Sequence, residues 1–102
     1  MRYIKVLTAG DQPRFASDAR GQGTDAENSR AMASSIAHLG TYTVDAAGEF
    51  SGNKVERSTF PNWVGDVRTR KELTLDVHGD RMIEQFQRPD GTRIAIEFER
   101  VR

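Results

Sequence analysis

The most conspicuous candidate site in the sequence is an aromatic loop, Phe60-Pro61-Asn62-Trp63-Val64-Gly65. Two large rings in one short loop can form the wall of a small-molecule pocket, and the amide of Asn62 between them can orient a polar group of the ligand. A structural role is the alternative, in which Phe60 and Trp63 plug the end of a sheet and Asn62 caps a turn. The two roles are compatible, since a plug residue can also line a pocket.

Glu84 is the carboxylate best placed for chemistry, because alternation along residues 81–88 puts it on the same face as Met82 and Phe86. A carboxylate on an apolar face needs a cation, which we expect to come from Arg68, Arg70 or Arg93. Such a pair could bind a polar ligand or act in acid–base catalysis. A structural ion pair, or an outward-facing strand in a dimer, is the alternative.

The two histidines, His38 and His78, show no spacing typical of metal ligands, and the chain contains no cysteine. We expect His38 in the last turn of a helix and His78 in a hairpin turn. The sequence has no nucleophile elbow, no P-loop and no dinucleotide-binding fingerprint. We therefore expect no metal site and no cofactor.

One helix and a run of strands must position these residues. Thr24 and Glu27 have the spacing of a capping box, and an apolar stripe at helical spacing extends from Met32 to Leu39. This pattern predicts a helix that ends with Gly40 as its C-terminal cap. Residues 14–23 are predicted to form an ordered loop anchored by Phe15.

Two-residue periodicity predicts about six strands, and the last of them form a meander with short turns. Glycines in His78-Gly79-Asp80 and Pro89-Asp90-Gly91 mark two of these turns. The predicted strands cover residues 3–8, 41–45, 49–58, 68–77, 81–88 and 92–101. The expected fold class is mainly β, an antiparallel meander with one α-helix, in a single domain over residues 1–102.

Composition limits the possible partners. The chain has 102 residues, and its 15 basic side chains are balanced by 15 acidic ones. A net charge of zero argues against a nucleic-acid or anionic-membrane partner. The N-terminal apolar run is too short for a signal peptide or a membrane span, so we expect a cytoplasmic protein.

The order of these motifs resembles that of the bacterial lipocalin-like domain family. The resemblance includes the segment Pro13–Ser17, the helix, the Gly-x-Tyr strand at Tyr42, the Phe-Pro-Asn-Trp-x-Gly loop at 60–65 and the Gly-Asp-Arg turn at 79–81. It implies a calycin-like antiparallel barrel with a cavity for a small hydrophobic molecule, and it identifies no reaction. Members of the family usually have further strands before the segment matched here.

A closed barrel typically needs about eight strands, so this chain is expected to form a partial barrel. A partial barrel leaves strand edges without partners, and two chains can cover each other's open edges. We therefore expect a homodimer. Ligand binding is the leading hypothesis. An interaction domain without ligand is the second, and an isomerase, cyclase or hydrolase that uses Glu84, His38 or Arg70 is the third. The expected ligand-binding residues are Phe15, Tyr42, Phe60, Asn62, Trp63, Arg70, Leu73, Leu75, Glu84 and Phe98.

Overall fold

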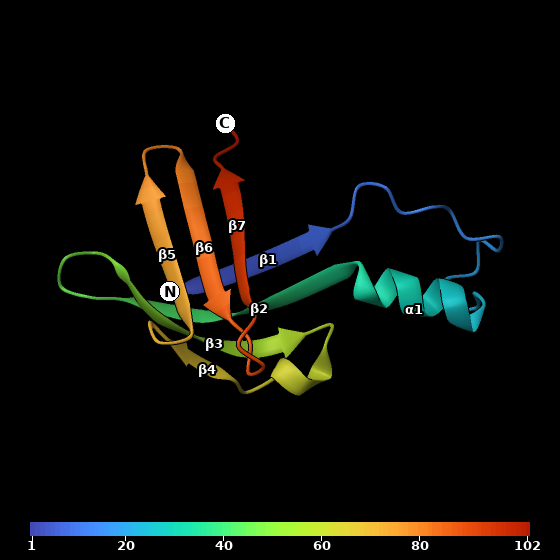
Figure 1. Cartoon of the computed structure of the whole chain (residues 1–102), viewed down its shortest axis with the longest axis horizontal. Helices are drawn as coiled ribbons and strands as arrows, with labels where there is room; N and C mark the ends of the chain where they lie inside the picture. The colour runs from blue at the N-terminus through green and yellow to red at the C-terminus, as the bar shows by residue number, and fades with distance from the viewer.

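The computed structural model describes residues 1–102 and is built mainly of antiparallel strands (Figure 1). One α-helix and one short 3-10 helix interrupt them. The elements follow in the order β1 (Arg2–Thr8), α1 (Asp25–Ala33), β2 (Ser35–Val44), β3 (Phe50–Ser58), η1 (Pro61–Trp63), β4 (Val67–Thr69), β5 (Leu73–His78), β6 (Arg81–Gln87) and β7 (Arg93–Glu99).

The strands form two sheets, of order β1-β2-β3-β4 and β5-β6-β7. Every neighbouring pair is antiparallel. Figure 1 shows the second sheet, in orange and red, crossing the strands of the first at a steep angle. The sheets do not close into a barrel, so the predicted mainly β, partial lipocalin-like barrel with one helix is confirmed.

The predicted extent of the helix is wrong. The capping box at Thr24 forms as expected, but the helix ends at Ala33, and the chain enters β2 at Ser35. This helix buries no residue, and a short helix without a packed face gains little stability. Residues 35–44 instead pair with β1 on one side and β3 on the other. Gly40 therefore lies inside a strand and is not a helix cap.

The predicted strand at 68–77 is two strands in different sheets. Strand β4 pairs with β3, and β5 pairs with β6. Between them a tight turn forms, in which the backbone N–H and the hydroxyl of Thr69 both donate to Glu72 Oε2 at 2.7 Å. This turn carries the chain from the first sheet to the second. The two glycine turns are confirmed, with φ of 62° at Gly79 and 90° at Gly91.

The apolar core is very small for a chain of this length. Val55 and Leu73 are its only buried hydrophobic residues. The accessible surface is 7881 Å², whereas a compact monomer of 11.4 kDa exposes about 5,800 Å². The radius of gyration is 15.9 Å, against about 13 Å for a compact domain of this length. The two sheets therefore leave much of their facing surfaces accessible.

Neither helix is long enough or apolar enough to cross a membrane.

Candidate functional site

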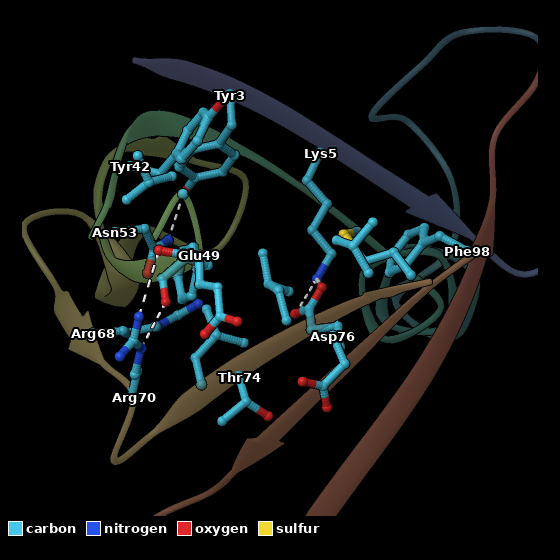
Figure 2. Close-up of a pocket in the computed structure, with 18 of the residues that line it drawn as sticks. Tyr3, Lys5, Tyr42, Glu49, Asn53, Arg68, Arg70, Thr74, Asp76 and Phe98 are labelled. Atoms are coloured by element: carbon cyan, nitrogen blue, oxygen red, sulfur yellow. Dashed lines mark hydrogen bonds and ion pairs between the residues drawn. The ribbon is translucent and has the colours of Figure 1, made fainter. Parts of the chain in front are cut away.

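The main cleft lies between the two sheets and has a volume of about 1090 Å³ (Figure 2). Half of its 22 lining residues are hydrophobic. Alternation along β1 turns Tyr3, Lys5 and Leu7 inward and leaves Ile4 and Val6 exposed. The first sheet thus presents polar side chains to the cleft, while Leu73 and Leu75 of β5 provide apolar surface opposite them.

A buried ion pair joins the sheets across this cleft. Lys5 Nζ on β1 donates to both carboxylate oxygens of Glu84 on β6, at 2.6 and 2.7 Å. The side chains are only 17% and 8% exposed. Glu84 faces the interior as predicted, but its expected arginine partner is wrong, because Lys5 neutralises the carboxylate. The ammonium group also lies 5.7 Å from the ring centre of Phe98.

A chain of hydrogen bonds runs along the inner face of the first sheet. Asn53 Nδ2 donates to Tyr3 Oη at 3.1 Å (Figure 2). Tyr3 Oη in turn lies 2.8 Å from His38 Nδ1. A neutral His38 with its proton on Nε2 accepts from the Tyr3 hydroxyl through Nδ1. The phenol, the imidazole and the amide therefore hold one another in fixed orientations.

Burial is the main cause of the pKa shifts of His38 and Tyr3. Burial, reinforced by the charges of Lys5 and Arg68, lowers the pKa of His38 from 6.5 to about 4. Burial also raises the pKa of the Tyr3 phenol above its usual value of 10.0. Both groups are neutral at pH 7, so the array can donate and accept hydrogen bonds without adding charge to the cleft.

Asn53 contributes one further polar group. Its Oδ1 is buried and has no hydrogen-bond donor within the chain. A buried acceptor without a partner is costly, and such groups need a specific explanation in a folded protein. Asn53 lines the main cleft, which is where a polar group of a ligand would be bound.

Arg68 lies beside this array. It is the direct cross-strand neighbour of Asn53, and its side chain is only 18% exposed. Its guanidinium carbon lies 4.7 Å from the ring centre of Trp63. The ring of Trp63 in turn packs edge-on against Phe60 at 5.7 Å and against His38 at 5.8 Å. The Trp63 ring of the aromatic loop therefore packs against the guanidinium group of Arg68.

A second hollow of about 610 Å³ opens on the other side of these polar residues. Its apolar lining includes Phe60, Trp63, Phe86, Ile94 and Ile96. Four residues line both hollows, and we call them the polar partition: Lys5, His38, Arg68 and Glu84.

The structure distributes the predicted ligand-binding residues over several places. The main cleft is lined by Tyr42, Arg70, Leu73, Leu75, Glu84 and Phe98. Phe60 and Trp63 line the second hollow. Phe15 and Asn62 line neither hollow, because Phe15 packs over Gly23 beside the helix and Asn62 is exposed.

The predicted site did not include Tyr3, Lys5, Asn53 or Arg68 as cleft residues. Alternation along residues 3–8 was the available signal for Tyr3 and Lys5, because it groups them on one face. Nothing local distinguishes Asn53 from a surface asparagine. His38 was expected near a helix end, and the structure instead buries it in β2 between Tyr3 and Trp63.

The lowered pKa of His38 predicts a pH-dependent stability. In the unfolded chain the imidazole binds its proton near pH 6.5, and in the folded chain only near pH 4. Stability from this group is therefore complete above about pH 6.5 and is lost as the pH falls toward 4. A histidine NMR titration should show a midpoint near 4 for His38, assigned with the variant His38→Gln. A midpoint near 6.5 would contradict the buried, neutral state.

The comparisons with known proteins give one match. A family model described as a lipocalin-like domain matches residues 2–94, which include both sheets as far as the start of β7. No curated protein and no solved structure matches the chain. The matched segment contains all four residues of the polar partition and the whole aromatic loop.

Proposed function

The chain belongs to the lipocalin-like domain family, and on that premise we propose that it binds a small, largely hydrophobic molecule in the main cleft between its two sheets. The observation that carries the proposal is the cleft itself. Its volume of about 1090 Å³ is slightly above the roughly 300–1,000 Å³ usual for small-molecule sites. Such sites usually have apolar walls and a few polar groups in fixed positions.

A second copy of the chain is the proposed partner that covers the open side. The accessible surface exceeds that of a compact monomer by about 2,100 Å², whereas a standard interface needs about 800 Å² from each partner. Strand β1 is an edge of its sheet, and its apolar residues Ile4 and Val6 are 74% and 63% accessible. An apolar edge strand of this kind is normally covered.

Light scattering and a dye titration on the same sample test this proposal. We expect the mass of a dimer and a saturable change in the fluorescence of Trp63, the only tryptophan, on addition of the neutral hydrophobic dye Nile red. The variant Leu75→Glu places a charge on the apolar wall of the main cleft and should weaken dye binding by about tenfold or more. The matched control Val64→Glu changes an exposed residue outside both hollows and should leave dye binding unchanged.

The outcomes separate the proposed functions. A dimer with saturable binding that Leu75→Glu weakens supports a ligand cleft closed by a second copy. A monomer that binds the dye contradicts the dimer but retains the ligand cleft. A chain that does not bind the dye contradicts the ligand cleft and favours an interaction domain without ligand.

A further inference from the structure

Within the proposed binding function, on which this inference rests, we infer that the ligand carries a carboxylate and that Arg68 of the polar partition binds it. The apolar part of the ligand then lies in the main cleft against Leu73, Leu75 and Phe98.

Arg68 is a cation without an adequate partner. Its nearest carboxylate oxygen, Asp66 Oδ2, is 4.0 Å away, at the limit of an ion pair, and the Asp66 side chain is 46% exposed. None of its guanidinium N–H groups makes a hydrogen bond within the chain. The side chain is nevertheless only 18% exposed. Because a guanidinium has five donors and cannot lose its charge, this arrangement leaves a site for an anion.

The other basic side chains that line the cleft, Lys5 and Arg70, are already paired, whereas its two carboxylates without an ion pair, Glu49 and Asp76, are exposed to solvent. Lys5 is neutralised by Glu84 through two short contacts. Arg70 donates to the Asp45 carboxylate and, at 2.7 Å, to the backbone oxygen of Phe50. His38 is uncharged at pH 7, because its pKa is about 4. The polar partition therefore has one net positive charge at neutral pH.

The charge and geometry of the site favour a carboxylate over other anions. A single negative charge balances the partition, whereas a phosphate dianion would leave an unpaired charge in a poorly hydrated place. The planar guanidinium can bind both oxygens of a carboxylate with two parallel hydrogen bonds. The Trp63 ring, 4.7 Å from the guanidinium carbon, packs against Arg68 and limits its movement.

A matched pair of probes tests this assignment: decanoate and decanol, each used to displace Nile red at pH 7. They share an alkyl chain and differ in the charged group. We expect the wild-type protein to bind decanoate about tenfold or more tightly than decanol, as a charged hydrogen bond implies. In Arg68→Gln the preference should disappear while the affinity for Nile red is retained.

Two further variants sharpen the test. Arg81→Gln makes the same change at an arginine that is 68% exposed and pairs with Glu97, and it should retain the wild-type preference for decanoate. Arg68→Lys retains the charge but cannot form two parallel hydrogen bonds to a carboxylate, so its preference for decanoate over decanol should be reduced. If Arg68→Gln does not fold, the reduced preference in Arg68→Lys still tests whether Arg68 binds the carboxylate.

The possible results distinguish this inference from the proposed function. Equal affinity of the wild-type protein for decanoate and decanol, with normal Nile red binding, would overturn the carboxylate assignment and leave the hydrophobic cleft in place. A decanoate preference that persists in Arg68→Gln would overturn the role of Arg68. Failure of all three probes to bind would overturn the inference together with the proposed function.

Discussion

Replacing Glu84 with leucine is expected to lower the free energy of unfolding by about 3–5 kcal/mol, because the ammonium of Lys5 is then buried without a counter-charge. Domains of this size are stable by only about 5–15 kcal/mol. The loss is therefore a large share of the total and should be clear in urea unfolding followed by circular dichroism. Loss of the pair also removes the only ion pair that connects β1 to the second sheet.

The double variant Lys5→Met/Glu84→Leu provides the decisive comparison. It replaces both charges with apolar side chains of similar size, and such replacements of buried pairs are often neutral or stabilising. We expect most of the lost stability to return. The exposed pair Arg81–Glu97 is the control, since its removal should cost less than about 1 kcal/mol. A double variant as unstable as Glu84→Leu would show that the ion pair is not the cause.

The variant Gly40→Ala should be the most damaging single-methyl change in the chain. A Cβ at Gly40 would lie 1.9 Å from the carbonyl oxygen of Lys54 on β3. Because the atom in the way belongs to the backbone, no side-chain movement can relieve the clash. Strands β2 and β3, the two central strands of the first sheet, would have to move apart. We expect a loss of about 3 kcal/mol or more, at the upper end for overpacking, and a fall in Tm of more than about 10 °C.

Thermal unfolding of Gly40→Ala beside Gly10→Ala measures this effect. A Cβ at Gly10 meets nothing within 4 Å, so this control should change the stability by less than about 0.5 kcal/mol. Equal midpoints for the two variants would refute the close approach of β2 to β3. A selective loss in Gly40→Ala would explain why a glycine lies in the middle of a strand, where it is otherwise unfavourable.

We expect stability and the proposed ligand binding to depend on different members of the polar partition. Lys5 and Glu84 neutralise each other and hold the sheets together, whereas Arg68 has no full partner. A variant at the ion pair should therefore act first on folding, and a variant at Arg68 should act first on ligand preference. This division allows the two roles to be measured independently.

Local features of the fold were predictable from sequence because their causes are local. The capping box at Thr24 depends on residues within one helical turn, and it forms as predicted. The turns at Gly79 and Gly91 need a positive φ that glycine adopts at little cost. The alternation that placed Glu84 on an inner face also follows from strand geometry alone.

The sequence by itself therefore determined the mainly β class, the start of the helix, the hairpin turns and the inward face of Glu84. Tertiary structure alone decided where the helix ends, because residues 35–40 pair with β1 and, from His38 onward, also with β3. It also decided that Lys5, 79 positions from Glu84, is the partner of that carboxylate. Burial in the folded chain, together with the charges of Lys5 and Arg68, lowers the pKa of His38, and the fold leaves Arg68 without a full counter-charge. Such contacts depend on how distant strands meet, and no spacing within the chain encodes them.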